Sequence, residues 1–354
     1  MTLENLTTSA IQLLKDLIEI PSFSSEEDLT AARIEQWFID SKIPFQRSQN
    51  NIWAMNADFD ASKPTLLLNS HHDTVKPNNG YTKDPFKAQV EEGKLFGLGS
   101  NDAGGCLVSL IATFTHFYAQ KNLNYNLVLV ASAEEESSGA AGLNSMLSII
   151  PEIDVAIVGE PTLMQLAVAE KGLVVFDALV KGTPGHAAHP NDDNAIYNVI
   201  EVLQWFKDYQ FEKYSESLGP VKMTVTQIHA GKQHNAIPAG VELVVDVRVN
   251  DQYSNKEIVD ILQKDAPCDS ILPRGLKLNS SSIPVAHPLV QAGIALGRET
   301  YGSPTLSDQS VLSCPSLKLG PGDSTRSHTA DEFIYVDEIN EGVALYIQLL
   351  TKIL

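Results

Sequence analysis

Cysteine is scarce in this sequence of 354 residues, which contains only three. Cys106, Cys268 and Cys314 lie far apart in the chain and are odd in number, which argues against a disulfide framework and fits a reducing cytoplasm. Long apolar runs are also missing, so no segment of the sequence is expected to cross a bilayer. The first residues lack the basic start and apolar core of a signal peptide. We therefore expect a cytoplasmic protein that does not associate with membranes.

Basic residues are few compared with acidic ones. The chain has 25 Lys and Arg against 44 Asp and Glu, a formal net charge of -19. Because phosphate binding needs clustered Lys and Arg, this balance disfavours a nucleic-acid partner. Acidity by itself chiefly indicates solubility, but it acquires chemical meaning where carboxylates converge on metal ions.

The apolar segments that are present alternate with predicted helices. Strands are expected over residues 66–69, 126–133 and 154–158, with helices over 104–121 and 336–354. Apolar strands separated by helices are typical of a parallel sheet that is covered on both faces. The fold class is therefore α/β, with a mostly parallel central sheet.

The alternation of apolar strands with helices stops near residue 172 and resumes near residue 283. Strands with alternating character are expected over 173–181, 222–229 and 241–250 in this part of the chain. Since 354 residues exceed one usual core, we expect a smaller α+β domain inserted into the α/β domain. The predicted boundaries are 1–171 and 283–354 for the larger domain and 172–282 for the insert.

Side chains that can bind metals follow four apolar strands, namely the three named above and a further one expected over residues 316–319. Ligands of parallel sheets bind beyond the carboxyl ends of the strands, so these side chains are expected at one edge. A single acidic residue in such a place more often caps a helix, but several together favour a functional site. The set comprises His71 and Asp73, Glu134 to Glu136, Glu160, His328 and, in a glycine-rich turn, Asp102.

The pair His71 and His72 raises the question of which histidine is functional. Side chains alternate along an extended chain, so His71 and Asp73 face one way and His72 the other. Ligand histidines commonly donate their second ring nitrogen to a carboxylate, which Asp73 can supply. We therefore expect His71 to be the functional residue and His72 to pack inside the protein.

Five motifs resemble those of the co-catalytic zinc hydrolases, which include acetylornithine deacetylase, succinyl-diaminopimelate desuccinylase, aminoacylase and several di- and carboxypeptidases. The segment 70–75, Ser-His-His-Asp-Thr-Val, is similar to the family's His-x-Asp-Thr-Val signature. The other four occur in the family's order: 97–105 resembles Gly-x-Gly-x-x-Asp-x-x-Gly-Gly, 133–136 Ala-Asp-Glu-Glu, 159–162 Gly-Glu-Pro-Thr, and 320–328 the last histidine motif.

The resemblance implies two divalent metal ions bridged by Asp102. One ion would be completed by His71 and Glu160, and the other by Glu136 and His328. Glu135 would be the general base and Asp73 would orient His71. Strand alternation alone would pair Glu134 with Glu136, so the choice of Glu135 comes from the resemblance. Two histidines and three carboxylates suit Zn²⁺ best, although Co²⁺ and Mn²⁺ also bind such sites. The family further implies a cis peptide bond between Asp102 and Ala103.

The inserted domain supplies the remaining candidates. The segment 182–190 resembles the family motif Gly-x-x-x-His-(Ala/Ser), which implies that His186 stabilises the oxyanion in the partner subunit of a homodimer. Asn235 and Arg248 match substrate-holding positions, Arg248 through the substrate carboxylate. We expect Ser324 to line the pocket as well. The remaining histidines of the chain are interpreted as structural: His116, His189, His229, His234 and His287.

Two other classes of protein are disfavoured by the sequence. The glycines near residue 97 fit neither a dinucleotide fingerprint nor a phosphate-binding loop, which disfavours a nucleotide-binding protein. A non-catalytic relative would lack a ligand or the base, and none is missing. The favoured function is a deacylase of small N-acyl amino acids (acetyl or succinyl) of the acetylornithine deacetylase type, in arginine or lysine biosynthesis. A desuccinylase and a metallo-di- or carboxypeptidase are the alternatives.

Overall fold

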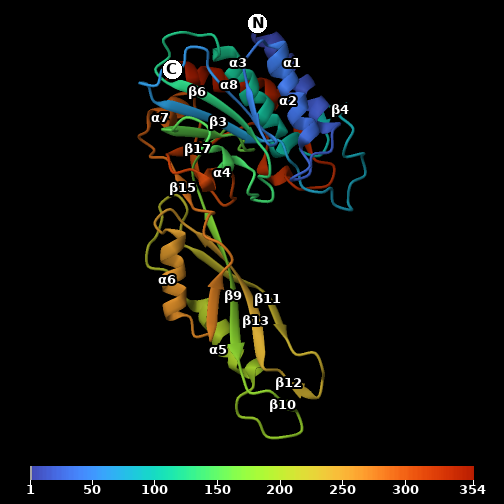
Figure 1. Ribbon diagram of the computed structural model, residues 1–354, viewed down its shortest axis with the longest axis vertical. Helices are drawn as coiled ribbons and strands as arrows, with labels where there is room; N and C mark the ends of the chain where they lie inside the picture. The colour runs from blue at the N-terminus through green and yellow to red at the C-terminus, as the bar shows by residue number, and fades with distance from the viewer. Residues whose placement is uncertain (1) are drawn as a thin grey trace. The chain divides into compact units, whose positions relative to one another are not determined.

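The chain forms two compact units in the computed structural model, which describes residues 2–354 (Figure 1). The first unit consists of the segment that ends at Val168 together with Ser282–Tyr301 and Ser307–Leu354. The second consists of Ala169–Ser281 with the short return Gly302–Leu306. Among the described residues, no helix is both long and apolar enough to span a membrane.

The first unit is built on a mixed sheet whose centre is parallel. Along its main part the strand order is β1-β2-β6-β3-β7-β17-β8. β3 runs parallel to β6 and to β7, and β7 runs parallel to β17, which confirms the predicted fold class. The strands are β1 (Gln46–Ser48), β2 (Asn51–Met55), β3 (Thr65–His71), β6 (Asn126–Ser132), β7 (Val155–Val158), β8 (Leu166–Glu170) and β17 (Ser316–Lys318); the short strands β15 (Ser281–Ser282) and β16 (Thr300–Ser303) complete the set.

Both faces of this sheet are covered, as its alternating side chains require. Leu66 and Leu68 pack into a large apolar core, whereas Leu67 between them belongs to a smaller core on the opposite face. Figure 1 shows α1, α2, α3 and α8 gathered on one side of the sheet. The helices are α1 (Leu3–Ile18), α2 (Asp28–Asp40), α3 (Gly105–Phe117), α4 (Leu143–Met146), α7 (Pro288–Ala295) and α8 (Val336–Thr351).

A small antiparallel sheet in the first unit joins two distant parts of the chain. It has the order β18-β5-β4, from β4 (Gln89–Glu91), β5 (Lys94–Phe96) and β18 (Phe333–Tyr335). Phe333 pairs with Phe96. This pairing brings the residue before β18 next to the glycine-rich turn that follows β5.

The second unit is a four-stranded antiparallel sheet with helices on one face (Figure 1). Alternate residues of its central strands, such as Val174 and Phe176, are buried and form one core with α5 and α6. The short strands β10 and β12, which are distant in the sequence, pair as a two-stranded antiparallel ladder that extends from the unit. The sheet order is β11-β13-β9-β14, and the elements are β9 (Gly172–Lys181), β10 (Gly185–His186), α5 (Ala195–Asp208), β11 (Lys222–Ala230), β12 (Ala236–Ile237), β13 (Gly240–Val249), α6 (Asn255–Asp265) and β14 (Ser270–Pro273).

Candidate metal centre

The candidate ligands that follow separate strands do converge at one edge of the central sheet. His71 ends β3 and its Nε2 lies 3.4 Å from Asp102 Oδ1, 3.7 Å from Glu160 Oε1 and 4.0 Å from Glu135 Oε2. The carboxylates come from the turn Ser100–Gly104 (η1), from the loop after β7 and from the loop after β6. The parallel order of the strands thus brings together residues that are up to 89 positions apart in the sequence.

The carboxylate of Asp102 lies between two histidines. Its Oδ1 faces His71, while its Oδ2 lies 3.5 Å from His328 Nε2. His328 Nε2 also lies 3.0 Å from Glu136 Oε2 and 3.1 Å from Glu136 Oε1. One carboxylate with an oxygen directed to each histidine is the arrangement that a ligand shared by two metal ions would need.

The residues present fit divalent metal ions. His71 Nε2 is buried, yet no hydrogen-bond partner satisfies it. Its ligand atom belongs to two groups whose members lie within 4.8 Å of one another: His71 with Asp102 and Glu136, and His71 with Glu135 and Glu160. An ion placed among these atoms would satisfy the nitrogen and neutralise the carboxylates around it. Imidazole nitrogens mixed with carboxylates suit Zn²⁺, Co²⁺ or Mn²⁺.

Crowding of buried acids changes the proton affinities at this edge. Burial and the neighbouring Asp102 raise the pKa of Glu160 to about 8. Burial likewise raises the pKa of Glu135 well above its usual range, with further contributions from Glu160, Asp308 and Glu136. The hydrogen bond with Glu136 raises the pKa of His328 to about 9, against an opposing effect of burial. Without a metal, the centre therefore holds protons that a cation would displace.

Asp73 links His71 to the glutamate loop. Its Oδ1 lies 3.3 Å from His71 Nδ1, and its carboxylate accepts hydrogen bonds from the backbone N–H groups of Glu135 and Glu136, both at 3.1 Å. The Ser24 hydroxyl donates a fourth contact at 2.7 Å. One buried carboxylate thus fixes the orientation of the histidine and the course of the loop together.

The structure explains why strand alternation fails for the run Glu134 to Glu136. β6 ends at Ser132, and Glu134 has a left-handed backbone with φ of 54°. Glu134 turns away from the centre, because its carboxylate accepts hydrogen bonds from Ser25 Oγ and Ala141 N. Glu135 and Glu136 are then the two that approach the histidines.

Two further expectations at this edge are confirmed. His72 is buried, and its ring nitrogens each lie 2.9 Å from a partner, Thr30 Oγ1 and Asn50 O. The peptide bond between Asp102 and Ala103 is cis.

Two buried glutamates were missed by sequence reasoning. Glu27 accepts the N–H groups of Ser25 and Glu134, and Glu332 accepts three N–H groups of the turn that carries Asp102. Both belong to loops without apolar periodicity and neither follows a strand of the central sheet. Their spacing in the sequence therefore gave no signal.

The candidate residues of the second unit lie in two places. His186 pairs with Ala236 in the ladder of β10 and β12. Ala187 N donates to Asn235 O at 3.0 Å, so His186 and Asn235 are neighbours. Arg248 lies in β13, where its guanidinium binds Asp246 at 2.9 Å. In the first unit, Ser324 is exposed at the start of the turn Ser324–Arg326 (η3), four residues before His328.

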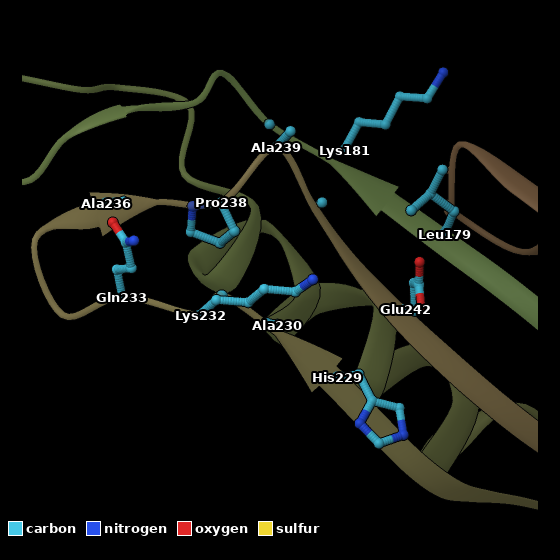
Figure 2. Close-up of a pocket in the computed structure, with 13 residues that line it drawn as sticks. Leu179, Lys181, His229, Ala230, Lys232, Gln233, Ala236, Pro238, Ala239 and Glu242 are labelled. Atoms are coloured by element: carbon cyan, nitrogen blue, oxygen red, sulfur yellow. The ribbon is translucent and has the colours of Figure 1, made fainter.

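A groove of about 970 Å³ lies beside the ladder of β10 and β12 in the second unit (Figure 2). Figure 2 shows His229 at the end of β11 and Glu242 on β13, with Lys232 and Gln233 on the connection between these strands. Glu242 is the single carboxylate among its lining residues. The groove therefore offers one imidazole and one carboxylate, whereas the edge of the central sheet gathers His71 with several carboxylates.

Comparisons with known proteins agree with this geometry. The family model described as Peptidase family M20/M25/M40 matches residues 67–352. Acetylornithine deacetylase of Shigella sonnei is 28% identical, with 96% of each chain covered. Succinyl-diaminopimelate desuccinylase of Wolbachia pipientis is 27% identical, covering 95% of this chain and 91% of that protein.

A solved structure from Bacillus subtilis has a similar fold. It is described as a dinuclear metal binding peptidase from the M20 family, and it aligns with a TM-score of 0.73 at 16% identity, covering 99% of this chain and 98% of its own. The family model covers well over half of this chain and includes every candidate metal ligand. The chain therefore belongs to the peptidase family M20/M25/M40 and is a metal-dependent hydrolase that acts on amide bonds.

Proposed function

We propose that this enzyme removes an acetyl or succinyl group from the amino group of a small amino acid. The reaction would be of the acetylornithine deacetylase type, in arginine or lysine biosynthesis. The observation that carries the proposal is Asp102 between His71 and His328, in a chain that two N-acyl amino acid hydrolases match over nearly their whole length. The three free cysteines fit the cytoplasmic location that the sequence predicts.

Two divalent ions, most favourably Zn²⁺, would be held by five side chains. His71, Asp102 and Glu160 would bind one ion, and Asp102, Glu136 and His328 the other. The Bacillus subtilis protein of the same fold is described as binding a dinuclear metal, which supports this number. When bound, such a pair polarises the amide carbonyl and makes water more acidic.

Glu135 would carry the proton through the reaction. Its carboxylate would accept a proton from the water that attacks the amide carbon, and then deliver it to the nitrogen as the carbon–nitrogen bond breaks. Asp73 would hold the base in place through the backbone N–H of Glu135.

Substrate contacts would come chiefly from the second unit. His186 would donate a hydrogen bond to the oxygen that becomes negative in the transition state. Arg248, oriented by Asp246, would bind the carboxylate of the amino acid, since a guanidinium matches a carboxylate with two parallel hydrogen bonds. Asn235 and Ser324 would complete the pocket.

The geometry of the second unit supports a homodimer. Gly182 N donates to Ala239 O beside the ladder of β10 and β12. Arg248 lies eight residues after Gly240 along β13, and this length of strand spans about 27 Å from Gly240 to Arg248. β10 and β12 lie at one end of the unit (Figure 1), so His186 on β10 is far from Arg248, which lies near the other end of β13. This distance along the strand is much longer than an N-acyl amino acid, which supports a second chain as the source of His186.

Exposed apolar residues of the second unit offer a surface for such a partner. On α5, Tyr197 and Ile200 are 69% and 61% exposed, and Ile228 is exposed on the sheet-edge strand β11. Apolar groups on an unpaired edge strand and its neighbouring helix favour association with another copy of the chain.

The proposal is tested by metal analysis combined with a substrate panel. Purified protein should contain two divalent ions per chain by elemental analysis, lose hydrolysis in a chelator, and regain it with Zn²⁺ or Co²⁺. The panel compares N-acetyl- and N-succinyl-ornithine, citrulline and diaminopimelate with simple dipeptides. Preference for an N-acyl amino acid supports a deacylase, preference for dipeptides supports the peptidase alternative, and full activity in metal-free protein contradicts the mechanism.

A further inference from the structure

Glu332 is a buried carboxylate that the reaction described above does not use. Glu332 directly precedes β18 and is 1% exposed. Glu332 Oε1 accepts hydrogen bonds from the backbone N–H groups of Asn101 and Asp102, both at 2.9 Å, and Oε2 accepts one from Gly99 at 3.2 Å. Three donors of one turn therefore converge on a single side chain.

The small sheet places Glu332 against this turn. Phe333 pairs with Phe96, and the backbone N–H of Gly97 donates to the carbonyl of Glu332 at 3.0 Å. The turn is thus held through both the backbone and the side chain of one residue. Gly99 has a left-handed backbone with φ of 74°. The turn is therefore not a regular helix, and its N–H groups point toward Glu332.

The N–H groups need this acceptor, because buried backbone donors without a partner are costly. A buried carboxylate beside other acids is also costly unless hydrogen bonds compensate for its lost hydration. Hydrogen bonds from three N–H groups to one side chain meet both needs at once. An apolar side chain at position 332 would fill the same space but leave the turn without acceptors.

The same turn reaches both histidines of the metal centre. Asp102 faces His71 and His328 with its two oxygens. Its neighbour Asn101 is fully buried, and its amide bonds the backbone N–H and C=O of Asp323, both at 3.1 Å. Asp323 precedes the segment that ends at His328. A shift of the turn would therefore move a ligand and the loop of a second ligand together.

We propose that Glu332 is a positioning residue of the metal centre, which sets the carboxylate of Asp102 at the distance that allows it to serve two ions. This inference rests on the proposed function in one respect, namely that Asp102 is a metal ligand. Because a bridging ligand serves both ions, Glu332 affects the binding of both, although it contacts neither.

The test uses Glu332→Gln and Glu332→Ala. Glutamine has nearly the same shape and keeps an oxygen for Asn101 and Asp102, but its NH₂ group faces the N–H of Gly99. Alanine removes all three acceptors. Zn²⁺ affinity is measured by competition with a chromophoric chelator, and thermal unfolding of the metal-free proteins is measured in parallel. We expect affinity for both ions to fall about 10–100-fold, more for alanine than for glutamine.

Glu257→Gln is the matched control. Glu257 also accepts a backbone N–H, that of Ser254 at 2.8 Å, but it lies in the second unit. This variant should bind Zn²⁺ as the wild type does. At saturating metal, the Glu332 variants should lose kcat with little change in KM, because the substrate contacts are untouched.

The outcomes separate the two proposals. If wild-type protein binds no metal, the proposed function fails first. If the wild type binds two ions and folded Glu332→Gln binds them with unchanged affinity, the positioning role is overturned. A loss of metal-free stability with unchanged affinity also overturns it and makes Glu332 a purely structural residue. Should alanine prevent folding, the near-isosteric glutamine variant decides.

Discussion

The two units hold their candidate residues in opposite ways. In the first, His71 is 1% exposed and is surrounded by carboxylates and hydrogen-bonded loops of its own chain. In the second, His186 lies exposed in the two-residue ladder of β10 and β12, and Asn235 lies exposed directly before β12. The proposed metal centre thus draws its residues from the first unit of one chain, whereas His186 and Asn235 would reach a substrate only in the proposed homodimer.

The largest effect is expected from Glu135→Ala. Loss of the proton carrier should lower kcat by about 10²–10⁴ while leaving the metal content at two ions, since Asp73 and the proposed ligands stay in place. Activity assays and elemental analysis on the same sample check this. In the companion variant Glu136→Ala, metal should be lost as well. The reverse pattern, with metal lost only from the Glu135 variant, would show that the assignment of the glutamate run is wrong by one residue.

A slightly smaller effect is expected from His186→Ala, about 10²–10³ in kcat for one lost oxyanion donor. The comparison is sharpened by unfolding this variant together with Glu135→Ala and refolding the mixture. In a mixed dimer, one site lacks both residues and the other has Glu135 from one chain and His186 from its partner. With random pairing, roughly a quarter of wild-type activity should return.

The mixing experiment has its own control. Each variant refolded alone should stay inactive, and native electrophoresis with a tag on one variant should show that mixed dimers form. Inactive mixed dimers would show that His186 acts in the site of its own chain or has no part in the reaction. The proposed sharing of residues between chains would then be wrong.

The smallest effect concerns pH and the stability of the metal-free first unit. The fold raises the pKa of Glu160 from 4.5 to about 8 and that of His328 from 6.5 to about 9. Both groups bind protons more tightly in the folded state, so their stabilisation is complete below the unfolded values and is lost as pH rises toward 9. Each pKa unit corresponds to about 1.4 kcal/mol at most.

Calorimetry of metal-free protein between pH 5 and 9 would measure this loss. Zn²⁺ replaces the bound protons, so its stabilising effect should be larger at pH 8 than at pH 6. If the stability of the metal-free protein rises steadily over this range, then Glu160 and His328 do not bind protons more tightly in the folded state.

The sequence was informative wherever regular structure preceded a side chain. Strands β3, β6, β7 and β17 have apolar patterns, and a parallel sheet forces their carboxyl ends to one edge, so the meeting of His71, Glu160 and His328 could be foreseen. His72 could be excluded as a ligand because β3 continues through His71 and preserves the alternation.

Local backbone turns limited what could be foreseen. The left-handed conformation of Glu134 reverses the alternation, and no propensity argument indicates it. Glu27 and Glu332 act through backbone N–H groups of loops distant in the sequence, and such contacts depend on tertiary structure instead of on spacing. The return of Gly302–Leu306 to the second unit likewise has no pattern of its own.

The contacts of Asp73 have a consequence for how mutations combine. This carboxylate serves His71, Glu135 and Glu136 simultaneously. Substitutions at these positions should therefore be strongly non-additive: once Asp73 is lost, a second loss at Glu135 should cost far less than it does in the wild type. Residues coupled in this way can change in evolution only as a group, whereas exposed residues such as Asn235 can change singly. Divergence in substrate preference should accordingly begin in the second unit.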